Sequence, residues 1–285
     1  MQIGSVMSIE IVFIRIISST LIKMSLIVRP VEHDDAEICG KIGYEAHKAV
    51  SSAHGYPSEQ PSEEFSIGLI KMLLGNPNSW GFLAERQDKI LGSIFIHRFP
   101  PSPMAVIGPL TVHPSAEGGV GRILMDAALM HARKQNHDHI RLVQSPSHIR
   151  SFVLYTKCGF VLREPLFLMQ GQLLKGRNIN LDTLNADVRL VRDDKDISEC
   201  NKLCKLAHGF SREMELRQAI DQGVATVIER GGDITGYAAG IGILCHAVAK
   251  SNEDLKALIA NASAILGPGF FVPGRNRELI NWLRT

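Results

Sequence analysis

The feature that most constrains the fold is a short glycine run between an apolar strand pattern and an amphipathic helix pattern. Gly118-Gly119-Val120-Gly121-Arg122 follows the strand predicted over Ala105–Val112 and opens the helix predicted over Val120–Gln135. Backbone N–H groups at a helix N-terminus point outward, and the helix dipole favours negative charge there. Glycine lets a phosphate approach the backbone because it has no Cβ. The run therefore predicts a phosphate-binding turn, although a helix that merely follows a flexible turn would contain the same glycines.

Two common classes of glycine loop do not fit this run. A dinucleotide-binding G-x-G-x-x-G that starts at Gly119 needs a glycine at position 124, where the chain has Leu124. A P-loop needs lysine and then serine or threonine after its last glycine, and Arg122-Ile123 stand there instead. The sequence excludes both classes.

The order of the strand and helix patterns predicts an α/β (α+β) fold with a mixed central sheet flanked by helices. Two strands joined at Arg86–Lys89 form a hairpin, and two later helices act as crossovers. In chain order the predicted elements are strand Leu26–Val31, a helix through Ile38, Ile42 and Ala46, helix Glu63–Leu74, strands Trp80–Glu85, Ile90–His97 and Ala105–Val112, helix Val120–Gln135, strand Ile140–Val143, helix Ile149–Lys157, and a closing strand pair, Phe160–Leu162 with Leu166–Met169.

The length of 285 residues suggests about two domains. We expect residues 1–24 to be an extension outside the fold, with an interfacial helix as the alternative. We expect a first domain over 25–170, a connector over 171–187 and a second unit over 188–285. Three segments of the second unit echo the first in order: Val188-Arg-Leu-Val-Arg-Asp-Asp echoes the segment at Val28, Glu229-Arg echoes Glu85-Arg, and Asn276-x-x-Leu echoes His148-x-x-Ser. The echoes predict a tandem with an incomplete second copy, although unrelated halves remain an alternative.

The second copy would stop at Thr285, before its last two strands. Either this half is truncated or another chain completes it. It also lacks a matching glycine loop, because Gly240-Ile-Gly242 leads into no helix-opening run. We therefore expect this half to be non-catalytic, with a structural or acceptor-shaping role.

Composition excludes several partner classes. Lys and Arg number 31 against 29 Asp and Glu, so the net charge of +2 predicts no nucleic-acid partner. No apolar run in 1–23 approaches the roughly 18 residues of a membrane span, and we expect no membrane partner. Five cysteines are too few for a disulfide framework, and the close pair, Cys200 and Cys204, fits one face of a helix rather than a metal site. We expect no metal and a reducing, cytoplasmic compartment.

Two motifs resemble those of the GNAT superfamily of N-acetyltransferases. Leu110-Thr-Val-His-Pro followed by Glu-Gly-Gly-Val-Gly-Arg-Ile-Leu is similar to the acyl-CoA-binding pattern of a strand, Val-x-Pro, Q-x-x-G-x-G and a helix. Ser151-Phe-Val-Leu-Tyr-Thr-Lys-Cys-Gly-Phe is similar to the second motif, N-x-x-A-x-x-[LF]-Y-x-x-x-G-F. The resemblance covers about 25–169, and the first domain is therefore expected to be GNAT-like. Because the three echoes predict a second copy of this domain, the partial second copy is expected to be GNAT-like as well.

Three features depart from these patterns. The loop between Val112 and Gly121 is one residue shorter, and the glutamine position falls on Ala116 or Glu117. In the second motif, His148 stands at the asparagine position and Ser151 at the alanine position.

The resemblance implies acetyl transfer from acetyl-CoA, as co-substrate, to a small-molecule or peptide amine by direct attack in a ternary complex. Main-chain groups of Leu110 and Val112 would run beside the pantetheine arm, and one N–H there would polarise the thioester carbonyl. The strand Ile140–Val143 would splay away to leave a slot. The expected cofactor-binding residues are Leu110, Val112, Glu117, Gly118, Gly119, Val120, Gly121, Arg122 and His148, of which Glu117 to Arg122 would hold the pyrophosphate through their N–H groups.

Tyr155 matches the family tyrosine that would give a proton to the leaving thiolate. The amine also needs a base, and His97 is the preferred candidate because it ends the strand before the cofactor strand. His113, His47, His54 and a relay through water are alternatives. The acceptor is expected over the loop 44–64. The competing functions are a non-catalytic acyl-CoA-binding sensor or interaction protein and a structural dimerisation protein, and a homodimer stays open for each.

Overall fold

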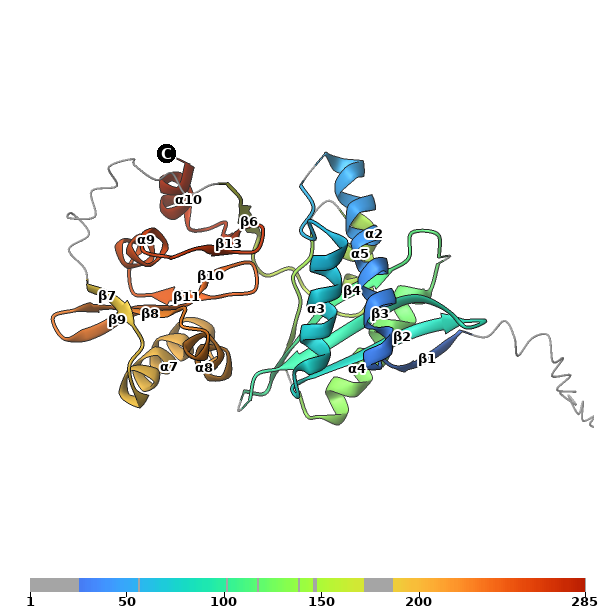
Figure 1. Cartoon of the computed structure of the whole chain (residues 1–285), viewed down its shortest axis with the longest axis horizontal. Helices are drawn as coiled ribbons and strands as arrows, with labels where there is room; N and C mark the ends of the chain where they lie inside the picture. Colours follow the sequence, from blue (N-terminus) through green and yellow to red (C-terminus); the bar gives the residue numbers. More distant parts are fainter. Residues whose placement is uncertain are drawn as a thin grey trace, which may run out of the picture.

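The computed structural model describes residues 26–55, 57–100, 102–116, 118–137, 139–145, 148–171 and 187–284 of the chain. They form two lobes that lie side by side (Figure 1). The extension predicted over 1–24 and connector residues 172–186 fall outside the described residues. Among the residues described, no helix has the length and apolar character that a membrane crossing requires.

The N-terminal lobe contains the predicted mixed sheet. Five strands lie in the order β1-β2-β3-β4-β5, with antiparallel pairing from β1 to β4 and parallel pairing between β4 and β5. The β2–β3 turn is the predicted hairpin, and Gln87 and Asp88 both adopt a positive φ, of 53° and 60°. The strands are β1 (Ile27–Pro30), β2 (Ser79–Arg86), β3 (Lys89–Arg98), β4 (Met104–Val112) and β5 (His139–Arg141).

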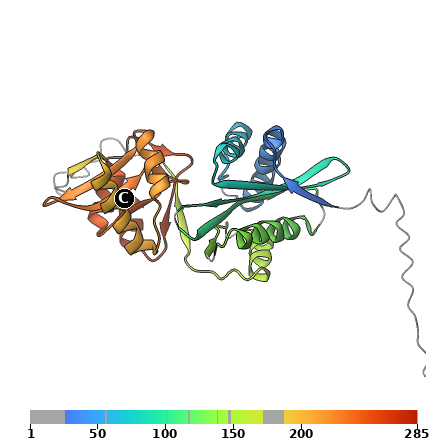
Figure 2. The same cartoon turned by 90° about the horizontal axis from the view of Figure 1, so that it is seen from below.

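Helices cover both faces of this sheet (Figure 2). The short 3-10 helix η1 (His33–Asp35) leads into α2 (Ala36–His54), which lies with α3 (Glu63–Gly75) on one face, and α4 (Val120–Lys134) and α5 (Ile149–Lys157) lie on the other. Alternating residues of β3 feed the two cores: Ile94 and Ile96 pack toward α4, whereas Phe95 packs toward α2 and α3. The predicted α/β (α+β) layers are confirmed.

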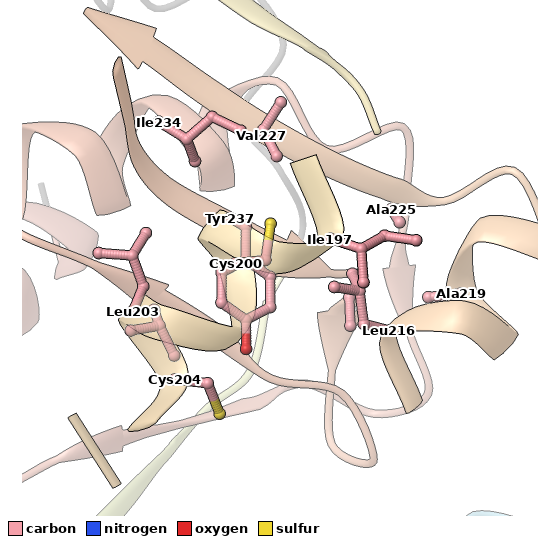
Figure 3. Close-up of a cluster of buried hydrophobic side chains, with 12 residues drawn as sticks. Ile197, Cys200, Leu203, Cys204, Leu216, Ala219, Ala225, Val227, Ile234 and Tyr237 are labelled. Atoms are coloured by element: carbon pink, nitrogen blue, oxygen red, sulfur yellow. The ribbon is translucent and has the colours of Figure 1, made fainter. Parts of the chain in front are cut away.

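The C-terminal lobe is built on an antiparallel sheet of four strands in the order β11-β9-β8-β7. Cys200 and Cys204 lie on one face of α7, fully buried with Tyr237 in its core (Figure 3), as their spacing predicts. The elements are β7 (Asp187–Leu190), α7 (Asp194–His208), α8 (Glu213–Asp221), β8 (Ala225–Arg230), β9 (Asp233–Ala239), β10 (Ile241–Gly242), β11 (Ala247–Ala249), α9 (Asn252–Ala260), β12 (Ile265–Leu266), β13 (Phe270–Pro273) and α10 (Arg277–Arg284).

The predicted closing strand pair is wrong. The strand β6 (Leu166–Met169) pairs antiparallel with β13 in the C-terminal lobe, and Phe160–Leu162 is not a strand (Figure 1). The two strands approach closely, since a Cβ on Gly269 would lie 2.3 Å from the Met169 carbonyl oxygen. Met169 also packs on the core of this lobe. The segment that follows the N-terminal lobe thus adds a strand to the C-terminal lobe, because β13 has an edge with which it can pair and an apolar core beside it.

Each lobe contains the same arginine geometry between its first two strands. Arg29 donates to both oxygens of Asp35 at 2.7 and 2.9 Å and to Glu85 at 3.2 Å. In the C-terminal lobe, Arg189 donates to both oxygens of Asp196 at 2.6 and 3.0 Å and to Glu229 at 2.9 Å.

The strand registers around the two arginines also correspond. Arg29 faces Leu83 and Arg189 faces Val227, and each acceptor glutamate follows a register shift in its strand. The sequence echo aligns Asp193-Asp194 with Asp34-Asp35, but the arginine binds Asp196, one turn into α7.

The C-terminal arginine pair should contribute measurably to stability. Arg189→Met leaves Asp196 and Glu229 without their cation in a half-buried site, and we expect a loss of about 2–3 kcal/mol at pH 7. Arg189 holds the pKa of Asp196 below its usual value, so the pair stabilises the fold above about pH 4 and loses this contribution as pH falls through the lowered pKa. Urea unfolding at pH 7 and pH 3 measures both effects. The exposed pair Lys202–Glu199 is the control, and equal losses in Lys202→Met and Arg189→Met would contradict the prediction.

Candidate active site

The pairing between the two parallel strands of the N-terminal sheet is short. β5 pairs with β4 only over Met104–Val106, and the remainder of β4 continues without β5 beside it. In the same stretch, Gly108 and Pro109 form a bulge, because Ile94 faces Leu110 while Ile96 faces Ile107. β5 ends at Arg141, so the predicted splay of the residues that follow it stays a prediction. The edge of β4 from Ile107 to Val112, where the sequence predicts the slot, has no β5 residue paired with it.

The glycine run forms the N-terminus of α4 at the end of this slot. Gly119 is the N-cap residue, with φ of 104° and no side-chain cap, so the first amide groups of the helix have no side-chain acceptor. The first turn contains no acidic residue, whereas the last turn carries His131, Arg133 and Lys134. This charge distribution leaves the positive end of the helix dipole uncompensated and suited to an anion.

The space above the turn is open. A Cβ at Gly118 or Gly119 would meet nothing within 4 Å, so a ligand can reach the backbone there. Val120 is buried and anchors the turn in the core. The Arg122 N–H donates to the Gly119 carbonyl oxygen at 3.1 Å, which leaves the donors that precede it for an anion. Glu117 lies outside the described residues.

Basic side chains lie beside the loop. A cavity of about 290 Å³ is lined by Arg86, Lys89 and the loop residues Ser115 and Ala116. The His113 N–H donates to the Leu91 carbonyl oxygen at 2.8 Å and ties the loop to β3. The neighbourhood of the glycine run is therefore positively charged on this side.

Helix α5 brings Tyr155 to the same region. A Cβ at Gly121 would lie 3.4 Å from Leu154 and 3.7 Å from Val112, so the start of α4 packs against α5 and against the end of β4. Tyr155 is half-buried, with its ring edge-on to Phe160 at 6.1 Å between centroids. Burial raises the pKa of the Tyr155 phenol, and a hydrogen bond with Ser151 opposes this rise.

His148 is the N-cap residue of α5, and its Nδ1 lies 2.6 Å from the Ser151 hydroxyl. Burial lowers the pKa of its imidazole, and the charges of Arg150, His47 and His54 lower it further. His47 and His54 lie on α2, so this helix and the start of α5 bring three imidazoles into one neighbourhood. The motif match did not select Ser151 as a residue of this site. The available signal was that a serine stands where the motif has an alanine.

The other histidine candidates lie apart from this group. His97 ends β3 opposite Val106, and burial lowers its pKa to about 4, with Arg212 of the other lobe as a second cause. His113 pairs through Nε2 with Glu45 at 3.1 Å and accepts a hydrogen bond from the Ser115 hydroxyl at Nδ1. The structure therefore does not gather the four histidines around one point.

Contacts between the lobes form a cluster that no sequence motif signals. The Arg212 guanidinium, which is ion-paired with Glu215, lies over the Phe99 ring at 5.6 Å. Arg141 lies over the Phe210 ring at 5.0 Å. These contacts place the second lobe against the end of β3, next to His97.

The C-terminal lobe has a different helix start after its last central strand. Ser251 caps α9 by accepting from the Asp254 N–H at 3.2 Å, and the first turn contains Glu253 and Asp254. A capped, acidic helix end repels a diphosphate, unlike the start of α4. In the part of the chain that the structure describes, no group of three or more His, Cys, Asp or Glu side chains is arranged to hold a metal ion.

Comparison with known families bears on this site. Residues 45–160 match the model of the Acetyltransferase (GNAT) family, a range that contains the slot, the glycine turn and Tyr155. These residues are similar to a GNAT acetyltransferase domain, and the match covers less than half of the chain. No curated protein matches the chain by sequence.

Two solved structures share the fold over most of the chain. A protein of Pyrococcus horikoshii described as a candidate acetyltransferase is 20% identical, with a TM-score of 0.65 over 91% of this chain and 84% of that one. The glucosamine N-acetyltransferase region of a fungal multi-domain β-N-acetylglucosaminidase is 18% identical, with a TM-score of 0.56 over 78% of this chain and 28% of that one. The PaiA N-acetyltransferase of Thermoplasma acidophilum, in complex with coenzyme A, is 20% identical, with a TM-score of 0.42 over 50% of this chain and 93% of that one.

The open space at Gly118 gives a direct test of the anion site. Gly118→Val adds a side chain that touches no protein atom but fills the approach to the backbone donors, so we expect CoA to bind at least about tenfold more weakly. Isothermal titration with CoA measures the change. Gly68→Val on α3, which also meets open space, is the matched control and should bind CoA like the wild type. Equal affinities for CoA in the Gly118 variant and the wild type would refute the site.

Proposed function

We propose that the GNAT domain transfers the acetyl group of acetyl-CoA to a primary amine of a small molecule or peptide, by direct attack in a ternary complex. The observation that carries the proposal is the uncapped, acid-free N-terminus of α4, which follows a strand whose pairing with β5 ends at Val106. A diphosphate needs such donors, and an extended arm leading to a thioester needs such a slot.

The co-substrate would lie along the residues that border the slot. The backbone donors from Gly118 to Gly121 would hold the diphosphate, with Arg122 contributing its side-chain charge, which it shares with Asp126 at 3.0 Å. Main-chain groups of Leu110 and Val112 would run beside the pantetheine arm, and one N–H there would stabilise the oxyanion that forms when the amine attacks. His148 would border the arm from α5.

Tyr155 would protonate the leaving thiolate. The carbon–sulfur bond breaks, the sulfur takes the electron pair, and the phenol proton passes to it. A phenol has an ordinary pKa of about 10 and a thiol about 8.5, so this transfer requires the hydroxyl to be held close to the sulfur. The packing of α5 against the starts of both the loop and α4 supports that placement.

The amine proton would pass to His97 or to water. The lowered pKa of His97 keeps its imidazole neutral at physiological pH, which is the form that accepts a proton. The same shift makes the imidazole a weak base, because Arg212 and burial oppose its charging. His97 therefore serves best as a transient acceptor that passes the proton onward.

We propose that the C-terminal lobe is a second, incomplete GNAT-like copy that does not catalyse. The repeated arginine geometry and strand order support common descent. Its capped, acidic α9 start supports the loss of co-substrate binding. The contact of Arg212 with Phe99, beside His97, supports a role in shaping the acceptor side of the first lobe. A cytoplasmic location is supported by the five cysteines, all of which are free thiols.

Removal of the phenol hydroxyl tests the enzyme assignment. Tyr155→Phe should lower kcat by about 10²-fold while CoA affinity stays close to that of the wild type, because the hydroxyl acts on the leaving group. Release of free CoA thiol over a panel of amines measures kcat. Thr156→Val, which removes an exposed hydroxyl from the same helix, is the control. Unchanged turnover in Tyr155→Phe would exclude it as the acid, and a wild type that binds CoA but acetylates no amine would favour the sensor.

The pH profile tests His97. A base acts in its deprotonated form, so kcat at saturating substrates should stay level as pH falls and decline only through about pH 4. His97→Gln should remove this limb. A limb near pH 6.5, the ordinary value of an imidazole, would assign the base to another group.

A further inference from the structure

The cavity of about 290 Å³ lies between the end of the β2–β3 hairpin and the loop that follows β4. Two cationic side chains, Arg86 and Lys89, face each other across the hairpin turn and line this cavity. Ser115 and Ala116 line it from the loop. Among the described residues of its wall, none is acidic, so the cavity is suited to an anion.

Arg86 has a donor that the protein does not use. Its Nε is buried, and among the residues that the structure describes it has no hydrogen-bond partner. A buried N–H of a charged group that lacks an acceptor costs free energy, and native folds ordinarily avoid this cost. An acceptor that reaches Arg86 from the cavity would remove it.

The C-terminal lobe shows what an arginine at this position binds. Arg86 directly follows the glutamate that binds Arg29. Arg230 directly follows the glutamate that binds Arg189, so it holds the same place in the second lobe. The Arg230 Nε donates to Asp254 at 2.6 Å. The equivalent arginine donor of the second lobe is therefore bound to an anion.

The two lobes differ in the source of that anion. α9 follows β11 as α4 follows β4, and Asp254 is the third residue of α9. The third residue of α4 is Arg122, and the first turn of α4 contains no acidic residue. A carboxylate of the protein thus binds the arginine in the C-terminal lobe. In the N-terminal lobe the cavity leaves the same place to an anion from outside.

The loop wall of the cavity is held in place by His113. Its Nδ1 accepts from the N–H and from the hydroxyl of Ser115, at 3.2 and 2.7 Å. Its Nε2 pairs with Glu45 of α2 at 3.1 Å, and its main-chain N–H donates to the Leu91 carbonyl oxygen. Because Ser115 gives its hydroxyl proton to the imidazole, it supports the wall and leaves anion binding to the two cations.

We propose that this cavity binds a phosphate monoester through Arg86 and Lys89. A monoester carries up to two negative charges at neutral pH and several acceptor oxygens, which match one guanidinium and one ammonium group. The site is distinct from the diphosphate turn, because the hairpin lies on the β3 side of β4 and the predicted slot lies on the β5 side.

The monoester has two possible sources. One is the ribose phosphate of CoA, in which case the inference rests on the co-substrate proposed above. Ala116 precedes Gly118 by two residues, which span at most about 7 Å, so a ligand held at the turn can also reach the cavity. The other source is a separate phosphorylated small molecule.

Paired titrations with CoA and dephospho-CoA, which lacks only the ribose phosphate, test the first source. If CoA supplies the monoester, the wild type should bind CoA about tenfold more tightly than dephospho-CoA. Arg86→Met should bring the two affinities close together and leave that for dephospho-CoA unchanged, and Arg86→Lys, which keeps the charge, should retain part of the difference. Arg133→Met removes the same charge from an exposed site at the far end of α4 and is the matched control.

A ³¹P NMR titration with inorganic phosphate tests the second source. If the ribose phosphate occupies the cavity, CoA should displace inorganic phosphate and dephospho-CoA should not. If a separate molecule occupies it, inorganic phosphate should bind equally with and without CoA, and the wild type should not distinguish the two nucleotides. For either source, Arg86→Met and Lys89→Met should weaken phosphate binding, whereas Arg133→Met should retain it.

Two outcomes would overturn the proposal. One is a wild type that neither distinguishes CoA from dephospho-CoA nor binds inorganic phosphate in a way that depends on Arg86. The other is an equal loss of affinity for both nucleotides in Arg86→Met, because this result would assign the arginine to the diphosphate. Failure of the proposed function is separate: phosphate binding that depends on Arg86, in a protein that acetylates no amine, would keep this site and contradict acetyl transfer.

Discussion

An α-helix that begins without a cap, after a strand whose parallel neighbour ends early, is the constraint on which the N-terminal lobe depends. β4 pairs with β5 over three residue pairs, β5 then ends, and α4 starts from the loop that follows β4. The helix cannot satisfy its first amide groups from its own sequence, because Gly119 has no side chain and no acidic residue follows in the first turn. The fold leaves these donors to a ligand, and the burial of Val120, Leu124 and Met125 keeps the helix in place without one.

In the second lobe, the first amide groups of helix α9 find acceptors within the protein. Ser251 caps α9 and Asp254 binds Arg230 at 2.6 Å, so the helix start is satisfied within the protein. The contrast between α4 and α9 is a difference of a few residues at one helix end, and under the proposed function it distinguishes the lobe that binds the diphosphate from the lobe that does not. The arginine geometry that both lobes share lies at the other edge of each sheet, where it supports the fold rather than a ligand.

The two lobes are joined by more than a connector. β6 leaves the first lobe and pairs with β13, and Arg212 reaches back to Phe99 at the end of β3. Arg212 is half-buried and ion-paired with Glu215, so the charge that meets Phe99 is balanced within the second lobe. A change in the second lobe would therefore alter the surroundings of His97.

Much of the first lobe followed from local pattern. The helix Ile149–Lys157 is identical in prediction and structure, and the hairpin turn at Gln87-Asp88 has the positive φ values that its residues tolerate. The contact of Ser151 with His148 did not follow from local pattern, because a serine in a helix is as compatible with an exposed face as with a bond to a neighbouring side chain.

The sequence by itself determined the helices, most of the strands and the glycine turn of the first lobe, since helix period, turn chemistry and the absence of a cap are properties of neighbouring residues. Only the tertiary structure decided that β6 joins β13, that Arg189 binds Asp196 instead of Asp193 or Asp194, and that Arg212 meets Phe99. These choices join residues far apart in the chain. The free energy of each contact depends on which strand edges and apolar faces remain uncovered after the lobes have packed. A local sequence pattern contains no information about this.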